Sequence, residues 1–363
     1  MAEPFKNLVS MASIRRLGDA LARVTPFDVA AFEAEANEDL HRLELKARVA
    51  QVAARLRPRL PERWSEAVST LVAALPPENP ELHGHAWLWP ALQVVESWGA
   101  DEPAVSLPAL RLMTSRFSAE FAIRPLLIRH PDGAYDTLLQ WTGDASEHVR
   151  RLVSEGSRPR LPWGVQLRDA VRDPSRGLAL LDRLVDDPSA YVRRSVANHL
   201  GDVAKDHPER AVAVAARWLE ENPARRSLVR HALRDPLKKG VPAALVLFGH
   251  AKGVAELSNL GVSADDVVEG ESVFVTADVR GCGAVRVDVV WQWPAVRGGW
   301  SSKTFRGGER TLQKGEVWNV RVRLSCKAVT TRPQRFGPQR LWLRVNGLDV
   351  GPLSFTLHAH QPG

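Results

Sequence analysis

Two stretches of the chain repeat each other forty-three positions apart, and this register limits the folds open to the chain. Residues 148–153 read HVRRLV and residues 191–196 read YVRRSV, each after a turn that contains Asp and Ser. A looser copy, RRSLVRH, follows at 225–231. A period near 40 residues is typical of HEAT-type repeats, in which one helix pair cannot bury its apolar face alone and stacks on the next. The register therefore predicts a helical solenoid with arginine pairs near successive helix starts.

The spacing of apolar residues changes near residue 260. Before it, Ala, Leu, Arg and Glu recur at helical spacing, whereas β-branched runs separated by Gly-rich turns follow from residue 262. Runs spaced in this way are typical of a small immunoglobulin-type sandwich. The 363 residues are enough for two domains. We expect a mainly α fold: a HEAT-like helical-repeat solenoid over residues 1–255, followed by an all-β immunoglobulin-like sandwich over residues 262–363.

The positive charge of the chain, a formal net +7, is concentrated in two regions. Residues 111–240 hold 23 Lys and Arg against 17 Asp and Glu, and residues 261–363 hold 14 against 9. A basic solenoid and a basic sandwich favour a polyanionic partner that contacts both. The alternative is that Arg replaces Lys on solvated faces, in which case the charge indicates no partner.

Motifs for cofactors and metals are missing from the sequence, which lacks a Walker loop, a nucleophile elbow and a zinc-protease motif. His83 and His85 have no further ligand at a recognised spacing, so we expect no metal and no cofactor. With neither a signal peptide nor a membrane span, we expect a cytoplasmic protein in which Cys282 and Cys326 are reduced, small buried residues.

Catalysis in such a chain depends on carboxylates, aromatic residues and water, and two glutamates stand out in the basic region. Glu120 lies between two Phe residues, and Glu155 precedes a Gly- and Pro-rich stretch that leads to Trp163. The alternative is structural: Glu120 pairs with Arg124, and Glu155 with Arg151, four residues apart on a helix. Each such pair stabilises a helix by about 0.3–0.5 kcal/mol.

Three segments resemble the AlkC branch of the HEAT-like-repeat DNA glycosylases. They are residues 115–127, residues 154–163 (SEGSRPRLPW) and residues 191–202 (YVRRSVANHLGD). The likeness covers most of residues 1–255, and residues 262–360 resemble the immunoglobulin-like domain that some AlkC members carry. The resemblance implies excision of positively charged N-alkylated bases, chiefly 3-methyladenine and 3-methylcytosine, from duplex DNA. By motif position it implies four active-site residues: Glu120, Glu155, Trp163 and Asp202.

The chemistry of such bases is consistent with these residues. Alkylation of a ring nitrogen makes the base a cationic leaving group, and carboxylates stabilise the oxocarbenium-like sugar that remains. The indole of Trp163 attracts the cationic nucleotide by about 1–2 kcal/mol when desolvated. This superfamily is expected to capture distorted duplex without enclosing the base in a pocket.

The expected partner is duplex DNA with alkylated bases, bound by a monomer. The arginines expected to contact its phosphates are Arg151, Arg158, Arg160, Arg193, Arg194, Arg226 and Arg230. Two other functions stay open. A non-catalytic DNA-binding scaffold needs the arginines but not convergent carboxylates, and a HEAT-type adaptor for proteins needs neither.

Overall fold

The computed structural model describes residues 5–77, 82–328 and 334–360, and the chain divides into two compact units, Met1–Asp206 and His207–Gly363. The helices of the first unit are α1 (Met11–Ala22), α2 (Val29–Ala36), α3 (Leu45–Leu56), α4 (Trp64–Ala73), α5 (Trp89–Trp98), α6 (Pro103–Thr114), α7 (Arg124–Arg129), α8 (Pro131–Trp141), α9 (Glu147–Gly156), α10 (Arg168–Arg172), α11 (Ser175–Leu184) and α12 (Ala190–Asp206). Short 3-10 segments join them at η1 (Phe5–Leu8), η2 (Leu40–Arg42), η3 (Arg57–Arg59), η4 (Leu82–Leu88) and η5 (Gly99–Asp101).

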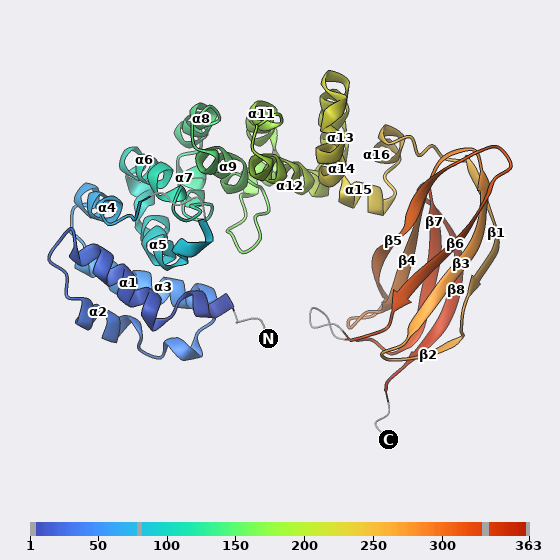
Figure 1. Cartoon of the computed structure of the whole chain (residues 1–363), viewed down its shortest axis with the longest axis horizontal. Coiled ribbons are helices and arrows are strands. Elements are labelled where there is room, and N and C mark those ends of the chain that lie inside the picture. The colour runs from blue at the N-terminus through green and yellow to red at the C-terminus, as the bar shows by residue number, and fades with distance from the viewer. Residues whose placement is uncertain (1–4, 78–81, 329–333, 361–363) are drawn as a thin grey trace. The chain divides into compact units, whose positions relative to one another are not determined.

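The helices of the first unit lie in two layers. Helices α4, α6, α8 and α11 follow one another along one layer, and α5, α7, α9 and α12 along the other (Figure 1). Helix α9 buries Val149, Leu152 and Val153, which recur at the i, i+3, i+4 spacing of a single helix face. That face packs against α12 and α11. Because no single helix covers its own apolar stripe, the unit is stabilised by contacts between successive pairs.

Both copies of the forty-three-residue register form helices, and the first arginine of each copy holds the turn that precedes its helix. Arg150 donates hydrogen bonds to the carbonyls six and five residues before it, at 2.7 and 3.0 Å. Arg193 does the same at 2.5 and 2.9 Å. These carbonyls belong to turns that would otherwise leave them to water. The first arginine of each pair therefore has a structural part in both copies.

The second unit begins with helices and continues as strands. Its helices are α13 (Pro208–Glu221), η6 (Pro223–Arg225), α14 (Arg226–Ala232), α15 (Arg234–Lys239) and α16 (Pro242–Leu247). Its strands are β1 (Ala255–Val262), β2 (Asp266–Val268), β3 (Ser272–Gly281), β4 (Gly283–Pro294), β5 (Trp300–Leu312), β6 (Val317–Ser325), β7 (Gly337–Val345) and β8 (Leu348–His358). The change from helix to strand therefore falls between residues 247 and 255, near the change in sequence pattern.

The strands form two sheets that enclose one core. One sheet has the order β1-β3-β6, and the other has the order β2-β8-β7-β4-β5. Alternate residues of β3 are buried, as expected for a strand with one face on a core. Trp291 lies at the centre of this core, 2% exposed, with the rings of Phe305 and Phe355 at 5.8 and 5.9 Å from it. The second unit thus has an apolar centre of its own.

The expectation of two buried cysteines is wrong for one of them. Both are free thiols, but Cys282 is exposed, because it lies in the turn between β3 and β4, outside the core. Cys326 is buried, and this burial raises the pKa of its thiol to about 11. Within the described ranges, we find no helix with the length and apolar character that crossing a membrane requires.

Candidate active site

Three carboxylates of the first unit lie along one line of ion pairs. Glu120 comes from the turn before α7, Glu155 from α9 and Asp202 from α12. Arg151 forms an ion pair with Glu120, and its Nη2 lies 3.7 Å from Glu155 Oε1. Arg158 then joins the other two, with Nη1 at 2.6 Å from Glu155 Oε1 and Nε at 2.7 Å from Asp202 Oδ2. Two arginines therefore bring together side chains from three separate elements.

Smaller side chains complete the hydrogen bonds of these carboxylates. The Ser195 hydroxyl donates to Glu155 Oε2 at 2.6 Å, and Lys205 Nζ donates to Asp202 Oδ1 at 2.7 Å. The Ser118 hydroxyl donates to Glu120 Oε2 at 2.9 Å. Glu155 is 6% exposed and Asp202 1% exposed, and both need such partners because a buried unpaired charge costs several kcal/mol. The three carboxylates face three cations, so the cluster is close to neutral.

The cluster keeps Glu155 ionised. Burial by itself would raise the pKa of this carboxyl, but Arg151, Arg158 and the hydrogen bond from Ser195 oppose it, and the pKa is lowered. A carboxylate with a lowered pKa holds its negative charge at neutral pH and is a poor proton donor. Glu155 is therefore suited to stabilise a positive charge and unsuited to protonate a leaving group.

An exposed indole lies on the loop that joins α9 to α10. Trp163 is 65% exposed and has a φ of 64°, a left-handed conformation that costs a non-glycine residue about 1–2 kcal/mol. The loop extends from the layer that contains α9 and α12 (Figure 1). Lys46 of α3 donates to the Trp163 carbonyl at 2.7 Å. Backbone strain of this kind persists only where the surroundings hold it.

A buried arginine holds the same loop. Arg124 is 1% exposed, and its guanidinium donates to the carbonyls of Gly156, Arg158 and Val165 at 2.8, 2.9 and 2.6 Å. Burial lowers the pKa of Arg124 to about 10, which leaves it charged at neutral pH. One cation therefore fixes both ends of the loop that carries Trp163.

The predicted pair of Glu120 with Arg124 is wrong, since Arg124 binds these carbonyls and Glu120 binds Arg151. The reason is that α7 begins only at Arg124, so Glu120 precedes the helix and the two side chains do not share a helix face. The other predicted pair, Glu155 with Arg151, is present at 3.7 Å.

The arginines expected at DNA phosphates have different surroundings. Arg151 and Arg158 use their guanidiniums on the carboxylates above, and Arg160 binds Asp206 through two hydrogen bonds of 2.7 Å. Arg194, the counterpart of Arg151 in the second copy, is exposed and has no ion pair with any described residue. For all of them a phosphate contact stays a prediction.

The remaining three are Arg193, Arg226 and Arg230. Arg193 is partly exposed and holds its turn, as described above. The other two lie on α14 in the second unit, and each guanidinium stands over the ring of Phe248, at 5.1 and 5.2 Å. Arg226 is exposed, whereas Arg230 also forms an ion pair with Glu309.

Known proteins match this chain over nearly its whole length. It is 36% identical to the uncharacterized protein YhaZ of Bacillus subtilis over 325 residues, which are 88% of this chain and 89% of that protein. It is also similar to a solved structure, the Pseudomonas fluorescens alkylpurine DNA glycosylase AlkC bound to DNA containing an abasic site analog. That match has a TM-score of 0.89 and 32% identity, and it covers 98% of this chain and 100% of that one. The chain belongs to the AlkC family of DNA glycosylases.

The second unit also matches a family model. Residues 256–359 match the model described as "Uncharacterised protein YhaZ, C-terminal Ig-like domain". The two sheets therefore form the immunoglobulin-like domain that accompanies the AlkC-like helical region in this chain.

Sequence reasoning missed several residues that shape the site of this AlkC-family chain. Ser195 carried a signal, because its counterpart forty-three positions earlier is the apolar Leu152, and a hydroxyl at a core position needs a partner. No signal in the sequence points to Arg124 or Lys46, because both donate hydrogen bonds to backbone carbonyls that are distant in sequence. The ring of Phe121, the residue next to Glu120, stacks on that of Trp89, with 5.6 Å between the ring centroids.

A buried histidine packs beneath the carboxylates. Burial lowers the pKa of His199 to about 4, so the ring is neutral at neutral pH. Its Nδ1–H donates to the Ser154 carbonyl at 2.9 Å, and its Nε2 faces Gly177, where an added Cβ would lie only 2.9 Å away. His199 therefore supports the site without carrying charge.

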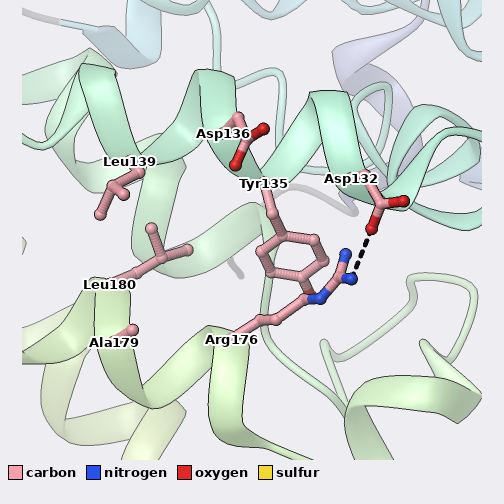
Figure 2. A pocket seen from close by; sticks show the side chains of 7 residues that line it. All are labelled: Asp132, Tyr135, Asp136, Leu139, Arg176, Ala179 and Leu180. Atoms are coloured by element: carbon pink, nitrogen blue, oxygen red, sulfur yellow. Dashed lines mark hydrogen bonds and ion pairs between the residues drawn. The ribbon is translucent and has the colours of Figure 1, made fainter.

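No group of three or more His, Cys, Asp or Glu is placed to hold a metal ion in the part of the chain that the structure describes, and the side chain of His83 lies outside that part. A hollow between α8 and α11 is lined by Tyr135 and Arg176, but Asp132 already pairs with that arginine at 2.5 Å (Figure 2). Arg176 is the one cation among the described residues of the lining, so this hollow offers no unpaired cation to an anionic ligand.

Proposed function

We propose that this protein hydrolyses the N-glycosidic bond of cationic alkylated bases, such as 3-methyladenine and 3-methylcytosine, in duplex DNA. One observation carries the proposal: Glu120, Glu155 and Asp202, from three separate elements, are brought together by ion pairs, and the group is close to neutral. The likeness to an alkylpurine DNA glycosylase supports the same conclusion.

The lowered pKa of Glu155 fits this chemistry. A base alkylated at a ring nitrogen leaves as a neutral molecule, so its departure needs little help from a general acid. The sugar meanwhile gains positive charge, which an ionised carboxylate stabilises more strongly in a site of low dielectric than in water. Glu155 and Glu120 are proposed to stabilise that charge and orient the attacking water, and Asp202 to assist through Arg158.

Trp163 is proposed to contact the alkylated nucleotide directly. Its indole is exposed, and the loop that carries it is held by Arg124 and Lys46. A fixed aromatic face attracts a cationic base without enclosing it. Recognition of this kind needs no deep pocket.

We propose that the helical region is built from HEAT-like repeats. We also propose that the protein binds the duplex as a monomer. Arg194 offers an exposed guanidinium at a helix start, on the copy that follows the carboxylates. Contacts of this type set the position of the protein on DNA without reading sequence. The basic second unit is proposed to add further phosphate contacts.

The proposal is tested by incubating the protein with duplex DNA that carries 3-methyladenine or 3-methylcytosine and measuring both base release and binding. We expect release of free base and an abasic product. Tight binding without base release would instead indicate a scaffold, and weak binding without release would indicate a protein adaptor.

A further inference from the structure

A pocket in the second unit is lined by positive charge. It has a volume of about 290 Å³, and its walls come from α14, α15, β4 and β5. Five cationic side chains line it: Arg230, Arg234, Lys238, Arg286 and Arg306. Because a single water needs about 30 Å³, the pocket has room for a tetrahedral anion together with several waters.

The carboxylates near this pocket do not balance its cations. Glu309 is shared by three arginines: it forms an ion pair with Arg230 and lies at 2.6 Å from Arg286 and 3.6 Å from Arg306. Asp288 accepts both remaining hydrogen bonds of Arg286, at 2.6 and 3.0 Å. These two carboxylates therefore pair with only three of the five cations.

The surplus charge lies at the mouth of the pocket. Arg234 and Lys238 are one turn apart on α15, and both are exposed. Neither forms an ion pair with a residue in the described ranges. Arg306 is 59% exposed and shares its only carboxylate among the described residues, at the long distance of 3.6 Å. Two or three cations at this mouth are thus available to an anion.

The walls of the pocket are fixed to each other. Arg344 of β7 donates from Nη1 to the Lys238 carbonyl at 2.8 Å, which ties the end of α15 to the sheet. Next to it, the backbones of Gly240 and Gly347 approach so closely that a Cβ on Gly347 would lie 2.8 Å from the Gly240 carbonyl oxygen. Both glycines also have positive φ, of 76° and 84°. A binding site with fixed walls loses little entropy when its ligand enters.

We infer that this pocket binds a phosphate group. Guanidiniums present planar, paired donors that match phosphate oxygens, and Lys238 adds a mobile point charge. The phosphate can come from the backbone of a bound nucleic acid or from a free oligophosphate, and the two sources share this chemistry. The nucleic-acid source rests on the proposed function, whereas the free source does not.

The test uses the full chain and two matched double variants. Arg234→Gln with Lys238→Gln removes two charges from the pocket. Arg323→Gln with Lys314→Gln removes two exposed charges elsewhere in the second unit and is the control. Calorimetric titration with inorganic pyrophosphate measures the affinity of each variant for a free oligophosphate. If that source is used, the pocket variant should bind about tenfold more weakly than the control, as expected when a charge-assisted hydrogen bond is lost.

The second arm measures affinity for unmodified duplex DNA over a range of salt concentrations. Each phosphate contact contributes about 0.9 to the slope of log affinity against log salt. If the pocket holds a backbone phosphate, the slope for the pocket variant should be shallower than that for the control by about 0.9 to 1.8. A change in either arm supports the proposal and names the source.

The proposal is overturned if the pocket variant matches the control in both arms. This outcome is independent of base release, because neither arm uses an alkylated base. If the protein releases no base but the pocket variant still binds pyrophosphate more weakly than the control, the proposed function fails and the phosphate site stands. All four substituted residues are exposed, so the variants are expected to fold, and their thermal unfolding is recorded alongside.

Discussion

Arg158 and Asp202, forty-four residues apart in sequence, are joined by a hydrogen bond of 2.7 Å between Nε and Oδ2, both nearly excluded from solvent. The same guanidinium binds Glu155. An arginine in this position fixes the separation of two carboxylates that would otherwise repel each other. It therefore holds both carboxylates in fixed positions before any substrate is bound.

Replacing either glutamate should slow base release while leaving duplex affinity nearly unchanged. For Glu155→Gln and Glu120→Gln we expect a barrier higher by about 2–4 kcal/mol, or roughly 30- to 1,000-fold in rate, because the stabilising charge is lost only in the transition state. Single-turnover cleavage of alkylated duplex measures the rate, and a binding titration measures affinity.

The matched control for these variants is Asp132→Asn, which removes an exposed carboxylate of the same unit. We expect its rate to equal that of the unsubstituted protein. Since a broken buried pair costs about 3–5 kcal/mol of stability, urea unfolding of each variant is needed to confirm that it is folded. Equal losses of binding and turnover in a folded variant would show that the glutamates are structural.

The two arginines of the second repeat copy should behave differently. Arg194→Ala is expected to weaken DNA binding and to make the slope of log affinity against log salt shallower by about 0.9, since the exposed guanidinium is predicted to contact phosphate. Arg193→Ala should lower the free energy of unfolding by about 1 kcal/mol, because two turn carbonyls lose their donor. Identical salt slopes for the two variants would contradict the phosphate contact of Arg194.

Two substitutions of Trp163 distinguish the effect of its backbone conformation on stability from the effect of its indole on activity. Because Trp163 has a positive φ, Trp163→Gly should be more stable to urea than Trp163→Ala by about 1 kcal/mol. Both variants should lose the same part of the activity on alkylated DNA, and a smaller part than the glutamate variants lose. Activity that is unchanged in both would remove the indole from the site.

Acid should destabilise the first unit partly through His199. The folded pKa of about 4 lies below the ordinary value of 6.5, so between these values the unfolded chain binds more protons and stability falls as pH falls. Each unit by which the pH falls in this window lowers the free energy of unfolding by about 1.4 kcal/mol. Between pH 6.5 and pH 5 we therefore expect the free energy of unfolding to fall by about 2 kcal/mol.

His199→Asn should remove that part of the pH dependence, which urea unfolding at the two pH values measures. His85 also has a pKa lowered by burial and adds to the slope in the same direction, so His85→Asn is the comparison. A pH dependence unaltered by His199→Asn would show that its ring is protonated in the folded state.

The helices α9 and α12 could be predicted from the sequence, because the repeat register and the apolar spacing are both local signals. Glu120 and Glu155 stand out in the sequence by their setting in the basic region, whereas Asp202 came from the resemblance. Of the ion pairs of these carboxylates, only the pair of Glu155 with Arg151 could be predicted from spacing. The pair of Glu120 with Arg151 depends on where α7 begins and on how α9 packs beside it, which no spacing along the chain encodes. The hydrogen bonds by which Arg124 holds the Trp163 loop could not be predicted either, because they also depend on how separate elements pack.

The first arginine of each repeat copy binds its own turn in both copies, whereas the second binds Glu120 in one copy and faces solvent in the other. One short motif therefore places an arginine that stabilises the fold directly before an arginine that can pair with a carboxylate of the candidate site. A chain built from such units can change the second position and gain, lose or relocate an active centre while every helix still begins where it did.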